Sequence, residues 1–260
     1  MRGDYSAKSP REKGLANPAP GATFAAMKKL TLIGFDADDT LWQNEAFFRL
    51  TQGRFESLLA DHAAPEHLHE RLLAAERRNV GHYGFGVKGF TLSMIETAIE
   101  VTEGRVPASV ISELIAAGRE MLSHPIELLP HAREAVSAAA AAGFRVMLIT
   151  KGDLMDQERK LAQSGLGDLF DAVEIVSDKT APVYARLFAR HGVAPETVMM
   201  VGNSLKSDVL PVIETGGWGV HVPHGLTWAL EHAEPPLGHE RFRELPDLAA
   251  LPALLDQLSA

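Results

Sequence analysis

The chain has 260 residues, a formal net charge of -9 and the composition of an ordinary globular protein. This acidic balance argues against a nucleic-acid or anionic-membrane surface, although a bound cation and one lysine can reverse the local field for an anionic substrate. The sequence has no cysteine, which excludes disulfides, thiol nucleophiles and cysteine-based zinc sites. A reducing compartment is therefore permitted, and we expect a cytoplasmic protein.

Residues 1–27 are polar and rich in Pro, Gly and Ala. They include basic residues but not the continuous apolar segment that a signal peptide needs, so we expect a disordered tail here. Met27 directly precedes the first predicted strand and is an alternative start. No later stretch is long and apolar enough to span a bilayer.

The first predicted strand ends in a cluster of carboxylates. The short apolar run 30–35 indicates a strand buried on both faces, and Asp36, Asp38 and Asp39 follow it. Ligands collect at the carboxyl ends of parallel strands, and residues two apart share a face, so Asp36 and Asp38 can converge on one point. Two close carboxylates favour a hard cation such as Mg2+ between them. An acidic turn in which Asp38 or Asp39 caps the next helix explains the stretch equally well.

Four helices are predicted before the second strand. The first covers about 45–61, the second begins at Pro65 and ends near 79, and the fourth begins at Pro107. The third helix is placed by three apolar residues in phase, namely Leu92, Ile95 and Ile99.

Residues 81–89 are too rich in glycine for a helix and are predicted to form a mobile loop. Tyr83, Phe85 and Lys88 lie in it and are candidates for substrate contact, because mobile loops over a site carry specificity. The alternative is a helix–helix connection with a few packed aromatic residues.

Strands and helices alternate in the second half of the chain. Strands are predicted at 144–149, 172–176, 197–201 and 219–222, with helices between them and a last helix near 248–258. The alternation predicts an α/β fold with a doubly wound, parallel, Rossmann-like sheet and right-handed crossovers.

The first crossover is unusually long. About a dozen residues suffice to join parallel strands, whereas roughly a hundred lie between the first two strands here. We therefore predict a helical cap domain at 44–128, inserted into a core made of 28–43 and 129–260. Its entry point beside the acidic pair favours a lid that excludes water and selects the substrate, over a stabilising decoration.

The later predicted strands also end in polar residues. Each of these has an ordinary explanation by itself, such as a helix cap or a solvated lysine. Together with the acidic pair they suit a phosphate site, with a carboxylate nucleophile, hydroxyl and N–H groups for the phosphoryl oxygens, a lysine and oxygen ligands for a cation. The residues concerned are Thr150, Lys151, Lys179, Asn203 and Asp208.

Four short motifs in this order resemble the signatures of the haloacid dehalogenase (HAD) superfamily of phosphohydrolases. The resemblance covers residues 30–222, and the helical insertion resembles the C1-type cap of that family. The motifs are Asp36-Ala37-Asp38-Asp39-Thr40, Ile149-Thr150, Lys179, and Gly202-Asn203-Ser204 followed by Asp208.

The resemblance implies a role for each of these residues. Asp36 would be the nucleophile that forms an aspartyl-phosphate, and Asp38 would protonate the leaving alcohol and then activate water. Thr150 and the N–H of Lys151 would hold the phosphoryl group, and Lys179 would balance its charge. Mg2+ would be held by Asp36, the backbone carbonyl of Asp38, Asn203 and Asp208.

Two positions depart from the pattern of the family. Asn203 replaces the first acid of the fourth motif, so the predicted metal site loses one negative charge and Asp208 is expected to carry more of that role. Asp39 stands where glycine is common, and the sequence assigns it no task.

We expect a Mg2+-dependent phosphatase acting on a small phosphomonoester, as a monomer or homodimer, with neither nucleic acid nor membrane as partner. A phosphomutase shares Asp36 and Asp38 and stays open, whereas a dehalogenase lacks the second acid. A catalytically idle binding protein on the same fold has no need to keep Thr150 and Lys179 as well. The sequence does not specify the substrate.

Overall fold

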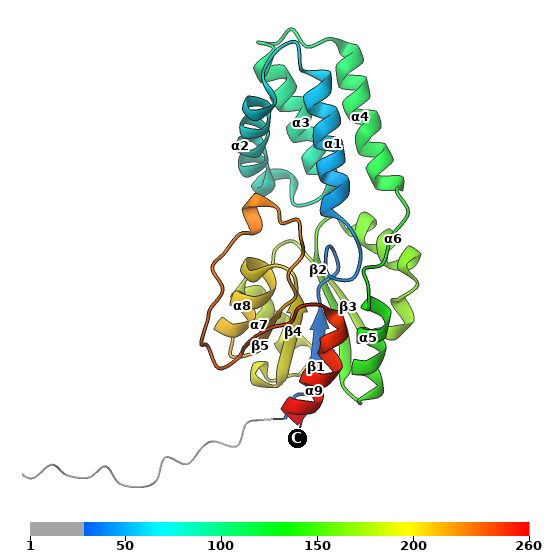
Figure 1. Cartoon of the computed structure of the whole chain (residues 1–260), viewed down its shortest axis with the longest axis vertical. Helices are drawn as coiled ribbons and strands as arrows, with labels where there is room; N and C mark the ends of the chain where they lie inside the picture. Colours follow the sequence, from blue (N-terminus) through cyan, green and yellow to red (C-terminus); the bar gives the residue numbers. More distant parts are fainter. Residues whose placement is uncertain (1–28, 260) are drawn as a thin grey trace, which may run out of the picture.

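A computed structural model describes residues 29–259, and the tail predicted at 1–27 lies outside them. Within this part of the chain, six parallel strands form one sheet in the order β3-β2-β1-β4-β5-β6 (Figure 1). The strands are β1 (Leu32–Phe35), β2 (Arg145–Lys151), β3 (Ala172–Val176), β4 (Val198–Gly202), β5 (Trp218–His221) and β6 (Phe242–Glu244). The predicted Rossmann-like fold is confirmed, and β6 adds a strand that the sequence did not indicate.

Helices cover both faces of the sheet. Successive side chains of a strand point to opposite faces, and the central strands β1 and β4 are apolar throughout, so both faces must be buried. Ile33 and Phe35 belong to one hydrophobic cluster, with α5 (Ala132–Ala141) and α9 (Leu251–Ser259). Leu32 points to the other cluster, which contains residues of α7 (Ala181–Arg190) and α8 (Leu210–Glu214). The fifth core helix, α6 (Leu154–Ser164), follows β2.

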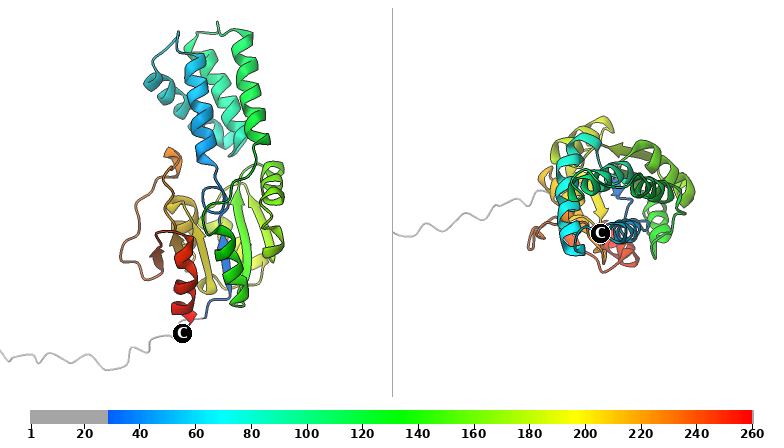
Figure 2. Two further views of the ribbon diagram at one scale, coloured as in Figure 1. Left: turned by 45° about the vertical axis from the view of Figure 1, so that its right-hand side comes forward. Right: turned by 90° about the horizontal axis from the view of Figure 1, so that it is seen from above.

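Four further helices stand beyond the carboxyl end of β1 (Figures 1 and 2). They have a hydrophobic cluster of their own, which includes Phe55, Leu72, Met94 and Leu114. None of the helices within residues 29–259 is long and apolar enough to cross a membrane. The four are α1 (Glu45–Leu58), α2 (Pro65–Tyr83), α3 (Val87–Val101) and α4 (Ala108–Ser123).

Two segments connect this helical unit to the sheet, and they are hydrogen-bonded to each other. The N–H of Gln43 donates to the carbonyl of Glu127 at 2.9 Å, and the N–H of Leu129 donates to the carbonyl of Leu41 at 2.9 Å. Trp42 and Leu128 form an antiparallel bridge between these bonds. The outgoing and returning chain therefore make one two-stranded connector.

The prediction of a mobile loop at 81–89 is wrong. Helix α2 continues through Gly81 to Tyr83, and α3 begins at Val87, so only residues 84–86 connect them. Gly84 and Gly86 have φ angles of 74° and 109°, which glycine adopts readily, and they supply the sharp turn. A single glycine inside a helix costs little, and packing between α2 and α3 outweighs that cost.

The apolar residues that indicated α3 in the sequence do not all lie on its buried face. Leu92 and Ile99 are 43% and 45% exposed. Phe90 and Met94 are buried instead, with Ala98 one turn further on. Both sets of residues fit the 3.6-residue period, so periodicity alone does not identify the buried face.

Candidate active site

One cavity of about 200 Å³ lies between the carboxyl ends of the strands and the helical unit. All seven core residues predicted from the motifs line it, so the structure brings them together at one place. They are Asp36, Asp38, Thr150, Lys151, Lys179, Asn203 and Asp208.

Asp36 follows β1 directly and is nearly buried. Its carboxylate accepts a hydrogen bond from Thr40 Oγ1 at 3.0 Å and forms an ion pair with Lys179. Burial and the neighbouring charge of Asp208 raise the pKa of Asp36 to about 7, against the opposing effect of Lys179. The site therefore favours an additional positive charge near Asp36.

Lys179 is 3% exposed and contacts two carboxylates at once. Its Nζ lies 2.7 Å from Asp208 Oδ1, in addition to the ion pair with Asp36. Burial acts to lower the pKa of Lys179, but Asp208 and Asp36 outweigh it and raise the pKa. Lys179 is thus held as a cation in the floor of the cavity.

Asp38 lines the same cavity but binds a separate set of partners. Its Oδ1 accepts hydrogen bonds from Trp42 Nε1 at 2.8 Å and Lys160 Nζ at 2.9 Å. Its Oδ2 accepts one from Gln157 Nε2 at 2.9 Å. Lys160 and Gln157 lie on α6 and are buried, so the helix after β2 fixes the orientation of Asp38.

Asp39 takes the helix-capping role that the sequence offered as the alternative explanation of the acidic turn. Its φ of 61° places it in the left-handed region, where glycine is the common residue. The carboxylate accepts hydrogen bonds from the N–H groups of Asn44 and Glu45, at 2.9 and 3.0 Å. Asp39 therefore caps the beginning of α1, while Asp36 and Asp38 remain directed to the cavity.

Thr150 and Lys151 end β2. The hydroxyl of Thr150 accepts a hydrogen bond from Gln157 Nε2 at 2.8 Å. Lys151 Nζ donates to Ser207 Oγ at 2.8 Å and lies 4.1 Å from the ring centroid of Phe85. The side chain of Lys151 thus reaches from the core to the turn between α2 and α3.

Asp36, Asn203 and Asp208 place side-chain oxygen atoms in the same part of the cavity. Thr40 Oγ1 lies 3.2 Å from Asn203 Oδ1, and Asp208 Oδ2 accepts a hydrogen bond from the N–H of Ser204 at 3.0 Å. A Cβ at Gly202 would lie 2.3 Å from Asp208 Oδ2, so only glycine fits beside this carboxylate.

This set of donors suits a hard cation such as Mg2+, because all of them are oxygens. Within residues 29–259, no three acidic or histidine side chains are arranged to hold a metal by themselves. The amide oxygen of Asn203 or a backbone carbonyl is therefore needed to complete such a site.

Three residues were predicted to contact a substrate from the helical unit, and the structure places only Phe85 in the cavity lining. Tyr83 is 53% exposed in the last turn of α2, and Lys88 forms an ion pair with Asp153 at 2.8 Å. The extension of α2 through Gly81 explains the difference, because Tyr83 becomes a helical residue instead of part of a loop.

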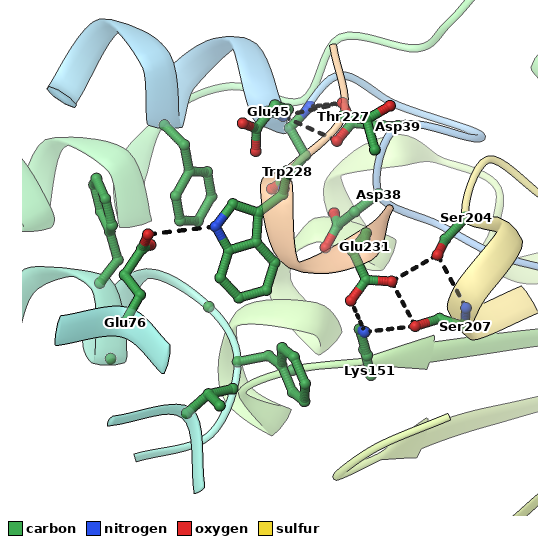
Figure 3. A pocket seen from close by; sticks show the side chains of 18 of the residues that line it. Asp38, Asp39, Glu45, Glu76, Lys151, Ser204, Ser207, Thr227, Trp228 and Glu231 are labelled. Carbon is green, nitrogen blue, oxygen red and sulfur yellow. Dashed lines mark hydrogen bonds and ion pairs between the residues drawn. The ribbon is translucent and has the colours of Figure 1, made fainter. Parts of the chain in front are cut away.

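Sequence analysis missed Glu231, which comes from the segment between β5 and β6 (Figure 3). Its carboxylate contacts Lys151 Nζ at 2.5 Å and accepts hydrogen bonds from Ser204 and Ser207, at 2.6 and 2.5 Å. Burial acts to raise the pKa of Glu231, but Lys151 and the two hydroxyl groups lower it. Glu231 therefore stands as a carboxylate at the edge of the site.

Trp228 was missed as well, and it connects the same segment to the helical unit. Its Nε1 donates a hydrogen bond to Glu76 Oε2 at 3.4 Å (Figure 3). The centroid of its ring lies 6.1 Å from that of Phe85. Arg49 contacts the carbonyl of Thr227 at 3.5 Å. No short motif marks these residues in the sequence.

The fold and site are those of a haloacid dehalogenase-like hydrolase. The family model for haloacid dehalogenase-like hydrolases matches residues 30–213, and the chain belongs to this family.

Similar proteins include a haloacid dehalogenase-like family hydrolase from Xanthomonas campestris, known from a crystal structure. It is 44% identical, with a TM-score of 0.79 over 88% of this chain and 92% of that one. A glyceraldehyde 3-phosphate phosphatase from Methanothermobacter thermautotrophicus is 23% identical over 79% of this chain and 91% of the relative. A phosphoglycolate phosphatase from Vibrio vulnificus is 32% identical over 52% of this chain and 57% of the relative.

Proposed function

We propose that this protein is a Mg2+-dependent phosphatase that hydrolyses a small phosphomonoester through an aspartyl-phosphate. The observation that carries the proposal is the contact of buried Lys179 with both Asp36 and Asp208 at the floor of the cavity. The phosphatases among the similar proteins support it.

In the proposed reaction, an oxygen of Asp36 attacks phosphorus, and the bond from phosphorus to the ester oxygen breaks. Asp38 gives its proton to the leaving alcohol. Asp38 then takes a proton from water, which attacks the aspartyl-phosphate, releases inorganic phosphate and regenerates Asp36. The Asp36–phosphorus bond thus forms and breaks once in each cycle.

The other predicted residues serve this reaction by holding charge. Thr150 and the N–H of Lys151 bind phosphoryl oxygens, and Lys179 balances their negative charge. Asp36, Asn203, Asp208 and the backbone carbonyl of Asp38 are the residues that would hold Mg2+. The ion would supply positive charge against the phosphoryl oxygens.

We also propose that residues 44–128 act as a cap over a core made of 28–43 and 129–260. The separate hydrophobic clusters support two units, and the cavity between them supports closure over a substrate. A cytoplasmic location and a monomeric or homodimeric state remain expectations from the sequence.

The first test is release of p-nitrophenol from p-nitrophenyl phosphate, with Mg2+ or with EDTA, by wild type and Asp36→Asn. We expect turnover that requires Mg2+ and falls by at least about 10³-fold in Asp36→Asn. Asp61→Asn, at an exposed residue between α1 and α2, is the matched control. Full activity of folded Asp36→Asn would contradict the assigned nucleophile.

A further inference from the structure

The part of the cavity inside the helical unit contains a carboxylate without a cationic partner. Glu76, on α2, contacts the neutral indole N–H of Trp228 at 3.4 Å. Among residues 29–259, no basic side chain lies within ion-pair distance of Glu76. The nearby Arg49 is bound by Glu45 at 2.9 Å.

Four aromatic side chains line the same cavity as this carboxylate. Phe48 and Phe90 have ring centroids 5.0 Å apart, and those of Phe85 and Trp228 are 6.1 Å apart. Figure 3 shows the Glu76 carboxylate directed at the edge of the Trp228 ring. Aromatic faces together with a carboxylate attract ammonium groups, through the quadrupole of the rings and by direct charge.

The end of the same cavity beside the strands is where a phosphoryl group is proposed to bind. Lys179 and Thr150 line it there, and Lys151 extends from there to a point 4.1 Å from the ring centroid of Phe85. A ligand with a phosphate at one end and a cation at the other would match both ends of the cavity. A carboxylate at the Glu76 end would place two like charges together in a partly buried site.

We infer that the substrates are phosphomonoesters of amino alcohols, whose ammonium group is bound by Glu76 and the rings of Trp228, Phe48 and Phe90. This inference rests on the phosphatase activity proposed above. It names Glu76 as the residue that determines specificity. Burial raises the pKa of Glu76 to about 7, against the opposing effects of the Trp228 hydrogen bond and the charge of Arg49.

Two pairs of esters test whether the positive charge of the substrate matters, because the members of a pair have similar shapes and only one of them is charged. Choline phosphate is compared with 3,3-dimethylbutyl phosphate, in which a carbon replaces the nitrogen, and ethanolamine phosphate is compared with propyl phosphate. We expect wild type to favour the charged member of a pair by about tenfold or more in kcat/KM. In Glu76→Gln this ratio should fall to about one.

Glu66→Gln is the matched control, because Glu66 is an exposed residue on the same helix and lies outside the cavity lining. It should keep the wild-type ratio. Equal rates on charged and neutral esters in wild type would overturn the inference and leave the phosphatase proposal standing.

If no ester is hydrolysed, p-nitrophenyl phosphate included, the phosphatase proposal fails, and binding decides the inference by itself. Choline phosphate and 3,3-dimethylbutyl phosphate are then titrated calorimetrically into wild type and Glu76→Gln. Tighter binding of choline phosphate that is lost in folded Glu76→Gln supports the ammonium site. Equal binding of the two esters, or no binding of either, overturns it.

Discussion

Glu231 and Lys151 form a largely buried ion pair at 2.5 Å, although they lie 80 residues apart in the sequence. Ser207 contacts both partners, and Ser204 contacts Glu231. The segment between β5 and β6 therefore contacts the end of β2, through this ion pair, beside the proposed phosphate site. Through Trp228 the same segment also reaches the helical unit.

Replacing Glu231 with Gln should lower the free energy of unfolding by about 1–3 kcal/mol, because Lys151 loses its charged partner and an amide accepts weaker hydrogen bonds. Urea denaturation followed by circular dichroism measures the change. Glu234→Gln, in the same segment but exposed, should be neutral. Equal stability of both variants would show that the ion pair contributes nothing.

Asn203→Asp should tighten the proposed Mg2+ site. The substitution returns one negative charge to the corner that Asp36 and Asp208 form, and the Mg2+ concentration for half-maximal activity should fall by about tenfold. Thr40 can still donate to a carboxylate at this position. An unchanged Mg2+ midpoint in a titration of activity would place Asn203 outside the metal site.

Gly81→Ala should raise the free energy of unfolding by up to about 1 kcal/mol, because Gly81 lies inside α2 and an added Cβ meets nothing within 4 Å. Gly84→Ala should lower it, since φ at Gly84 is 74°. Thermal unfolding of the two variants measures the sign of each change in unfolding free energy. Destabilisation by Gly81→Ala would contradict a helix at this position and support the loop that the sequence predicted.

The stability contribution of Glu76 should depend on pH. Burial raises its pKa from 4.5 to about 7, so the folded chain holds this proton more tightly than the unfolded chain does. The contribution is fully present below pH 4.5 and is lost as the pH rises to about 7, with a slope of up to about 1.4 kcal/mol per pH unit.

The difference in unfolding free energy between wild type and Glu76→Gln isolates this effect. It should fall from pH 4.5 to about 7 and stay constant above that range. Glu45, whose pKa burial also raises to about 7, is present in both proteins, but the charge of Glu76 adds to that rise and is absent from Glu76→Gln. A difference independent of pH would mean that Glu76 titrates alike in the folded and unfolded chain.

The core residues of the site were predictable because short motifs fix them to strand ends. A parallel sheet brings the carboxyl ends of its strands to one edge, whatever the connections between the strands. The residues that follow these ends therefore lie close together, namely Asp36, Thr150, Lys179 and Asp208. The capping explanation for the acidic turn is confirmed for Asp39, while Asp36 lines the cavity and the cation site stays a prediction.

Residues outside regular structure were not predictable in this way. Trp228 and Glu231 lie at the two ends of a single 3₁₀ turn (Ala229–Glu231) that has no period or motif, and their place depends on what this segment packs against. The face of α3 was ambiguous because Leu92 and Phe90 begin equally regular apolar series. The three residues of β6 are too few to give a strand signal.

The hydrogen-bonded connector at residues 41–43 and 127–129 limits how the helical unit can move. Two separate single chains would permit a swivel about their common axis, whereas a paired ribbon resists shearing one strand past the other. If residues 44–128 act as the proposed cap, we expect the cavity to open by a hinge rotation in one plane. Glu76 is then expected to return to the same position relative to Lys179 at each closure, which keeps the distance that a substrate must span constant.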